Sequence, residues 1–158
     1  MARKAMTVTT PGLEIVMTRS FNAPKELVFE AHTSCEHTRN WWGPRRYEVS
    51  ECEIDFRPGG TWRMVHMGEG QEIAFFGEYR EIDRPNSFTW TFGFDGMPGD
   101  PGVERYSFEE ADGVTTLTAR AQFGSAEERD SVLNSGMQEG AAETWDRLEE
   151  YLETLAAG

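Results

Sequence analysis

The sequence predicts an α+β domain in which an antiparallel sheet wraps around one long C-terminal helix. Two observations predict this class. Over 47–123, β-branched and aromatic residues alternate with charged ones, and turn residues recur about every eight to twelve positions, as in antiparallel strands. Over 126–155 the apolar spacing becomes helical, and this is the one expected element long enough to cover a sheet face. A strongly twisted sheet around a single helix leaves a space between the two.

The expected elements before the last helix are one strand, two short helices and six more strands. The first strand covers 13–21 and ends ahead of Pro24, which starts the first short helix. The second short helix covers 36–42, stops at Gly43 and Pro44, and with the first closes one end of the sheet. The six further strands are expected over 47–56, 61–67, 72–82, 88–94, 104–109 and 114–123.

The long helix begins with a capping-box pattern, Ser125 followed three residues later by Glu128. Gly136 and Gly140 are expected to weaken it locally, by about 1 kcal/mol each relative to Ala. The chain is therefore interpreted as a flexible N-terminal tail over 1–12 and a single domain over 13–155.

Charge and hydropathy exclude several classes of protein. The formal net charge is −13 at pH 7 with a pI near 4.6, which disfavours contact with nucleic-acid phosphates and anionic membrane surfaces. The mean hydropathy is −0.59, and no stretch approaches the ~20 apolar residues that a membrane-spanning helix needs. We expect no nucleic-acid partner and no membrane span.

The cysteines and the N-terminus predict a cytoplasmic location. Cys35 and Cys52 are too few for a disulfide framework, and together with 7 Met they suit a reducing compartment. The N-terminal residues contain no apolar block of the length that a secretory signal requires.

More than half of the net charge lies in the last helix. Over 126–153, nine acidic residues stand against Arg129 and Arg147, a net charge of −7. Most of these acids fall off the apolar stripe, so a solvated outer face is expected, with a docking surface for a basic partner as the alternative.

Five motifs resemble one family, in the order in which they occur: Asn40-Trp41-Trp42-Gly43-Pro44, Asp55-Phe56-Arg57-Pro58-Gly59-Gly60, Gly77-Glu78-Tyr79, Arg84-Pro85, and Gly136-Met137 ahead of Trp145 and Leu148. Over 13–155 the chain is similar to the activator of heat-shock protein 90 ATPase homologue family, within the START-like (SRPBCC) superfamily. The resemblance implies a helix-grip fold with an interior cavity. Superfamily members bind lipids, sterols or polyketides, and some are cyclases. The eukaryotic chaperone activators carry an additional N-terminal domain for which this chain has no room, so a chaperone partner is not expected.

Large aromatic and polar side chains on the strands and in the Trp41-Trp42 pair are the candidate ligand-binding residues. They are Trp41, Trp42, Trp62, Met64, His66, Phe76, Glu78, Tyr79, Trp90, Phe92, Tyr106, Phe108 and Met137. The alternative for each aromatic residue is an ordinary place in the core. The loop over 95–102, rich in Gly and Pro, is a candidate gate or a plain surface excursion.

His66 and Glu78 are the candidate catalytic residues. His66 shares a strand face with Trp62 and Met64 by the two-residue period, but the sequence leaves open whether this face is concave or solvent-facing. On a concave face His66 would orient a ligand, with Glu78 or Asp55 as its acid-base partner.

Two further patterns are interpreted as structural. His32, Cys35 and His37 match no standard zinc spacing and lack an evident fourth ligand, so no metal is expected. The 57–60 segment lacks the spacing of a phosphate-binding loop and is interpreted as a hairpin turn, with Asp55 and Arg57 in an ion pair with each other or with a neighbouring strand.

The leading functional hypothesis is a small-molecule binding domain that holds a hydrophobic or aromatic ligand in the internal cavity, without a cofactor. An enzyme of cyclase, dehydratase or hydrolase type acting in the same cavity is the second hypothesis. A co-chaperone-like protein-interaction module is the third. The oligomeric state stays open, with a homodimer compatible with the sequence.

Overall fold

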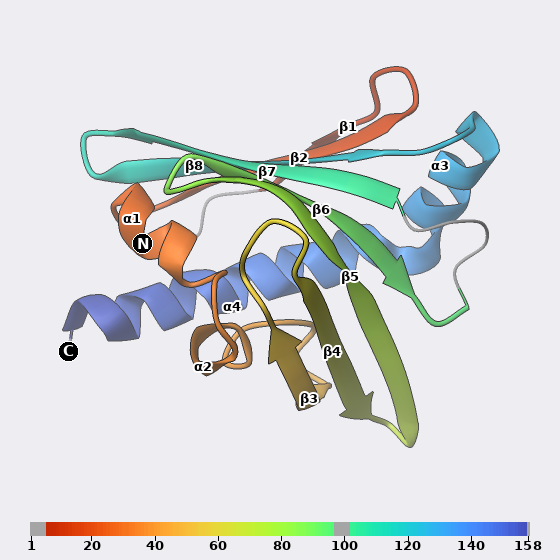
Figure 1. The fold of residues 1–158 in the computed structure, drawn as a ribbon, viewed down its shortest axis with the longest axis horizontal. Helices are drawn as coiled ribbons and strands as arrows, with labels where there is room; N and C mark the ends of the chain where they lie inside the picture. Colours follow the sequence, from red (N-terminus) through yellow and green to blue (C-terminus); the bar gives the residue numbers. More distant parts are fainter. Residues whose placement is uncertain (1–5, 97–101, 158) are drawn as a thin grey trace.

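The structure, a computed structural model, describes residues 6–96 and 102–157. Within them, eight antiparallel strands form one sheet in the order β1-β2-β8-β7-β6-β5-β4-β3, and the last helix crosses one face of this sheet (Figure 1). The strands are β1 (Thr7–Thr9), β2 (Glu14–Phe21), β3 (Glu48–Ile54), β4 (Thr61–Gly68), β5 (Gln71–Asp83), β6 (Ser87–Phe94), β7 (Gly102–Ala111) and β8 (Val114–Gln122). The helical segments are α1 (Lys25–Glu30), α2 (Cys35–Thr38), α3 (Ala126–Val132), the π turn η1 (Leu133–Met137) and α4 (Gln138–Ala157).

The path of the chain confirms the expected α+β class and the helix-grip arrangement. Strands β3 to β8 follow one another as neighbours, and β2 joins the sheet beside β8. The connection through α1 and α2 carries the chain from β2 to β3 at the opposite edge of the sheet. Both short helices lie near the C-terminal half of α4, where His37 of α2 contacts Tyr151 (Figure 1).

Part of the predicted N-terminal tail belongs to the sheet. Residues Thr7–Thr9 form the edge strand β1, with Thr7 opposite Thr18 of β2. A three-residue strand is too short to show an alternating pattern, which explains why the sequence did not indicate it. Residues 1–5 lie outside the described part of the chain.

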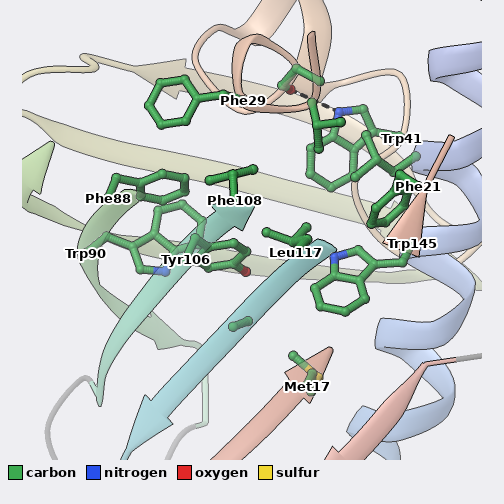
Figure 2. Close-up of a cluster of buried hydrophobic side chains, with 14 of the residues drawn as sticks. Met17, Phe21, Phe29, Trp41, Phe88, Trp90, Tyr106, Phe108, Leu117 and Trp145 are labelled. Carbon is green, nitrogen blue, oxygen red and sulfur yellow. Dashed lines mark hydrogen bonds between the residues drawn. The ribbon is translucent and has the colours of Figure 1, made fainter. Parts of the chain in front are cut away.

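The second short helix ends earlier than predicted. It covers Cys35–Thr38, and the following residues continue in turns up to Gly43, which has a φ of 84°. Trp41 and Trp42 therefore lie after the helix. The ring of Trp41 is buried, and its indole N–H donates to the carbonyl oxygen of Ala31 at 3.1 Å (Figure 2).

The predicted long helix is present with one interruption. The Ser125 half of the capping box forms as expected, since its hydroxyl accepts a hydrogen bond from the backbone N–H of Glu128 at 3.1 Å, while the Glu128 carboxylate accepts from the backbone N–H of Gly124 at 3.2 Å. At Gly136 the backbone has a φ of 89°, which separates α3 and η1 from α4. Glycine adopts this conformation without the steric cost that a Cβ would add. No residue of α3 is fully buried, and Val132 at its end is the α3 residue that packs, partly buried, against the core.

Aromatic side chains fill the end of the interior near α1, which we call the closed end. Phe29 of α1 makes edge-to-face contacts with Phe56, Phe88 and Phe108, at centroid distances of 5.7, 6.1 and 5.1 Å. Figure 2 shows Phe88 and Phe108 on neighbouring strands with Phe29 above them. From α4, Leu148 and Leu152 complete the core.

No helix within the described residues is both long enough and apolar enough to cross a membrane. The candidate gate over 95–102 falls largely outside the description, because residues 97–101 are not included.

Candidate ligand cavity

A cavity of about 500 Å³ lies between the concave face of the sheet and the first half of α4. We call this region the open end. Its lining comes from β2 (Ile15, Met17), the segment after α2 (Trp41, Trp42, Gly43, Pro44, Arg46, Tyr47), β4 (His66), β5 (Ile73, Phe75), β6 and the residue after it (Phe92, Phe94, Asp95), β7 (Gly102, Glu104, Tyr106), β8 and the residue after it (Ala121, Phe123), α3 (Val132), η1 (Ser135, Gly136, Met137) and α4 (Gly140, Ala141, Thr144, Trp145).

Small residues on facing elements leave this volume unfilled. Ala121 of β8 lines one wall, while Gly140 and Ala141 of α4 line another. A Cβ added at Gly140 would lie 3.7 Å from the ring of Pro44, so the segment after α2 approaches the helix closely there. The alanine and glycine side chains in these places are too short to span the gap between sheet and helix.

Glu104 is a buried acid on the cavity wall. Its side chain is on the inner face of β7 and only 8% exposed, and one carboxyl oxygen accepts a hydrogen bond from the indole N–H of Trp90 at 2.8 Å. The hydroxyl of Tyr106 is a second hydrogen-bond donor to this carboxyl group. Burial raises the pKa of Glu104 above its usual value, because desolvation outweighs both hydrogen bonds.

His66 faces the concave side, which settles the question that the sequence left open. It is 3% exposed, and its ring stacks on Tyr47 at 5.7 Å and contacts Phe75 at 4.6 Å. Burial, together with the positive charge of Arg147, lowers the pKa of His66 to about 4, so its ring is neutral near pH 7. Its Nε2 atom has no hydrogen-bond partner within the described residues.

Gly43 explains how the His66 ring fits below the Trp41-Trp42 segment. A Cβ at Gly43 would lie 2.4 Å from the His66 ring, closer than two such atoms approach in proteins. The Gly43-Pro44 motif that resembles the family therefore has a packing role in the cavity wall as well as a helix-ending one.

Two arginines attach the cavity walls to α4. Arg147 donates hydrogen bonds to the carbonyl oxygens of Trp42 at 3.2 Å and Gly43 at 2.9 Å, which holds the segment after α2 on the helix. Arg19 of β2 is 2% exposed and donates to the carbonyl oxygen of Trp145, with Glu149 at 3.9 Å. Glu149 is itself buried, so not every acid of the helix lies on a solvated outer face.

Six of the predicted ligand-binding residues line the cavity: Trp41, Trp42, His66, Phe92, Tyr106 and Met137. Five others are buried beside it and belong to the core: Trp62, Met64, Tyr79, Trp90 and Phe108. The rings of Trp62 and Trp90 stack at 4.1 Å, so each covers the other and neither reaches the cavity lining.

Phe76 and Glu78 lie on the outside of the sheet. Both are exposed, because the odd-numbered positions of β5, such as Phe75 and Tyr79, face inward. The expected acid-base pair of His66 and Glu78 is therefore not formed. Asp55 does not replace Glu78, since its carboxylate pairs with Arg57 at 2.9 Å in an exposed turn, which confirms the ion pair predicted there.

The segment that resembled a metal site has other partners. Cys35 is joined to Cys52 by a disulfide bond, which links α2 to β3 and contradicts the expectation of two reduced thiols. The Nδ1 atom of His32 contacts the carbonyl oxygen of Val28 at 2.8 Å, and that of His37 contacts the hydroxyl of Tyr151 at 2.6 Å. No group of three metal-ligating side chains occurs in residues 6–96 and 102–157. Disulfides persist mainly in oxidising compartments. The bond therefore removes the cysteine argument for a cytoplasmic location, which stays a prediction.

The sequence reasoning missed Glu104 and Arg147. A signal for Glu104 was available, because it stands two and four residues before Tyr106 and Phe108 and so shares their inward face. Arg147 has no comparable signal, since its partners are backbone carbonyl groups more than a hundred residues away.

A family model described as Activator of Hsp90 ATPase homolog 1-like protein matches residues 22–153. Among solved structures, Protein Ms6760 from Mycobacterium smegmatis is 26% identical, with a TM-score of 0.84 over 92% of this chain and 96% of that one. A protein from Rhodobacter sphaeroides is 24% identical, with a TM-score of 0.86 over 94% and 99% of the two chains. One from Nitrosomonas europaea is 24% identical, with a TM-score of 0.83 over 92% and 97%. The last two similarities concern the fold alone. No curated protein sequence is similar enough to count as a relative.

Proposed function

The chain belongs to the Activator of Hsp90 ATPase homolog 1-like protein family, and on that premise we propose that it binds a small, largely apolar molecule between its sheet and its C-terminal helix. The observation that carries this proposal is the cavity of about 500 Å³. Ligand sites typically measure about 300–1,000 Å³ and combine an apolar lining with a few polar groups. The aromatic rings, Glu104 and His66 supply both here.

The two ends of the interior differ in how completely side chains fill them. Protein interiors are packed as densely as organic crystals, and voids much larger than a water molecule are uncommon. The closed end of the same molecule meets this standard, with aromatic rings in mutual contact around Phe29. A void restricted to one end of a well-packed domain is consistent with a binding site.

An enzymatic role in the same cavity has less support. His66 is on β4 and Glu104 on β7, with two strands between them. On β5, His66 lies opposite Ile73, whereas Glu104 is aligned through Trp90 with Tyr79, so the backbones are separated by about 14 Å across the strands and also by six positions along them. General acid-base catalysis by a pair needs side chains within hydrogen-bond reach of one substrate. We therefore keep binding as the proposal.

The experiment is a fluorescence titration with N-phenyl-1-naphthylamine, a neutral apolar dye whose emission rises in apolar surroundings. We expect saturable binding and quenching of tryptophan emission, because Trp41, Trp42 and Trp145 line the cavity. Ala141→Phe places a ring in the cavity and should abolish binding, whereas Ala126→Phe, on the exposed first turn of α3, should leave it unchanged. Equal binding by the two variants, or no binding by the wild type, would contradict the proposal.

A further inference from the structure

Resting on the binding function proposed above, we infer that the ligand carries a protonated nitrogen, as an alkyl or arylalkyl ammonium group, and that this nitrogen pairs with Glu104. Three features of the cavity support this inference. They are an acid without a counter-ion, a wall of aromatic rings, and basic groups that are already occupied.

The carboxyl group of Glu104 has donors but no cation. Its partners are the indole N–H of Trp90 and the hydroxyl of Tyr106, both neutral. In register, Glu104 lies opposite Trp90 of β6 and Ala121 of β8, so no charged residue flanks it in the sheet. No ion pair within the described residues involves it. A buried carboxylate is costly unless it is paired, so a cation brought by a ligand would remove that cost.

The aromatic rings around the cavity also favour an ammonium group. Trp41, Trp42, Phe75, Phe92, Tyr106 and Trp145 all contribute to its lining. Aromatic faces attract ammonium groups through the ring quadrupole, by about 0.5–2 kcal/mol per contact. A carboxyl group among aromatic rings therefore recognises an amine better than a neutral or an anionic head group.

An anionic ligand would find one arginine in the described lining, the exposed Arg46, and this side chain already has an acidic partner. Arg46 is exposed, stacks on Tyr47 at 5.0 Å and pairs with Glu69 at 3.6 Å. The guanidinium group of Arg147 is occupied by backbone carbonyl groups, including that of Gly43. His66 is held neutral by its burial. A carboxylate or phosphate ligand would also meet Glu104 and Asp95, the two acids of the lining. The net charge of −13 acts in the same direction, because it raises the local concentration of cations.

The experiment compares four probes that share one ring system: 1-naphthylmethylamine, 1-naphthylmethanol, 1-methylnaphthalene and 1-naphthoate. Affinities are measured by displacement of N-phenyl-1-naphthylamine from the wild type and from Glu104→Gln. Glutamine keeps the shape of the side chain, can still accept from Trp90 through its amide oxygen, and can donate from its NH2 group to the hydroxyl oxygen of Tyr106, so the main property it removes is the negative charge. We expect the amine to bind the wild type at least about tenfold more tightly than the alcohol or the hydrocarbon, with the carboxylate weakest. In Glu104→Gln this preference should disappear, while the affinity of the hydrocarbon stays the same.

The two proposals fail in different ways. If all four probes displace the dye equally, or if the alcohol equals the amine, the cavity binds apolar molecules but charge recognition by Glu104 is wrong. If no probe or dye binds, the proposed function itself is wrong. Should Glu104→Gln not fold, the ranking of the four probes on the wild type alone decides the inference.

A separate observation, on the boundary between the two ends, carries a second inference. We infer that one water molecule is bound in a small void of about 10 Å³ that is lined by His32, Trp42 and Tyr79. Three buried polar atoms in this region have no hydrogen-bond partner within the described residues: Nε2 of His32, Nε1 of Trp42 and the hydroxyl oxygen of Tyr79. Buried polar atoms are nearly always paired, and one water needs a void of about 10–15 Å³ with two to four polar partners.

The hydrogen-bonding roles of the three groups are compatible. The Nδ1 atom of His32 lies 2.8 Å from the carbonyl oxygen of Val28 and must donate to it, so Nε2 of the neutral ring accepts. A water can therefore donate to His32, accept from the indole N–H of Trp42, and exchange a hydrogen bond with the hydroxyl of Tyr79.

A crystal structure at 1.5 Å resolution or better tests this second inference. We expect one density peak within hydrogen-bond distance of both His32 and Tyr79 in the wild type, and its loss or displacement in Tyr79→Phe. Well-ordered side chains around a void without density would overturn it.

Discussion

The two ends of strand β6 both carry inward-facing aromatic residues, but these residues differ in how deeply they are buried. Phe88 and Trp90 are 1% and 3% exposed and are enclosed by other rings, whereas Phe92 and Phe94, on the same inward face, are half-buried and line a cavity. The difference comes from what stands opposite. At the closed end, Phe29 of α1 fills the space, and at the open end α4 presents glycine and alanine. An alternating strand therefore specifies which side faces inward, and the facing elements decide whether the inside is filled.

The largest expected difference between the two ends concerns loss of a ring. Phe29→Ala should lower the free energy of unfolding by about 3–5 kcal/mol, because it leaves a void among fully buried rings. Phe92→Ala should cost less than about 1.5 kcal/mol, because this side chain already borders a void and is half-buried. Urea denaturation followed by circular dichroism measures both values. Equal losses would mean that the open end is as tightly packed as the closed end.

The pH dependence of stability compares the two ends of the interior through their buried histidines. Burial lowers the pKa of His32, at the closed end, and of His66, at the open end, from 6.5 to about 4. Both are neutral in the folded protein above pH 4, while the unfolded chain takes up their protons below pH 6.5. Stability should therefore be complete above pH 6.5 and fall as the pH drops towards 4, by roughly 3 kcal/mol for each fully buried histidine.

Urea midpoints measured between pH 7 and 4 on the wild type, His32→Gln and His66→Gln give each contribution. In each variant, the fall in stability between pH 7 and 4 should be smaller by the contribution of the histidine that was replaced. A smaller share for His66 than for His32 would indicate that water in the cavity solvates its charged form. An unchanged slope in both variants would contradict the burial of these rings.

Two alanines on β8 provide a matched pair for added volume. Ala119 is fully buried, and Ala121, the next inward position, borders the cavity. Ala119→Leu should destabilise the fold by about 1–3 kcal/mol through overpacking. Ala121→Leu should be neutral or stabilising and should weaken binding of N-phenyl-1-naphthylamine. Thermal unfolding and dye titration check both effects, and destabilisation by Ala121→Leu would argue against an unfilled space beside it.

The smallest expected effects come from the two glycines near the cavity in the last helix. Gly136 has a φ of 89°, so Gly136→Ala should destabilise the protein by roughly 1 kcal/mol. Gly140 is helical, and a Cβ there would make ordinary contact with Pro44, so Gly140→Ala should stabilise by about 0.5–1 kcal/mol. Opposite signs of the two changes in melting temperature are the expected result. The same sign would mean that the interruption at Gly136 is absent in solution.

Periodicity predicted the order of the elements and the fold class, because each strand of the meander carries its own alternating pattern and the last helix its own cap at Ser125. It did not predict which face of β4 carries His66, nor that Glu78 points outward. Both depend on which side of the sheet the last helix covers, and that is a long-range property. The sequence predicted a locally weakened helix at Gly136 and not an interruption, since a glycine tolerates a positive φ without requiring one.

The volume of the cavity was the property that the sequence predicted least well. The residues that leave the cavity open, Ala121, Gly140 and Ala141, are small and carry no chemical signal. Large aromatic residues were therefore assigned to the cavity as a class, although Trp62 and Trp90 stack on each other in the core. Only the distances between facing elements separate rings that cover one another from rings that face a void.

The bond between Cys35 and Cys52 turns one wall of the cavity into a covalent ring. The loop that it closes spans 17 positions and contains Trp41, Trp42 and Gly43. A ring of this length removes chain entropy equivalent to about 3 kcal/mol from the unfolded state, and it persists when the sheet and the helix separate. The wall segment thus remains tethered to Cys52 in the denatured chain. A single cut by a protease inside the loop would leave the protein in one piece until the disulfide is reduced.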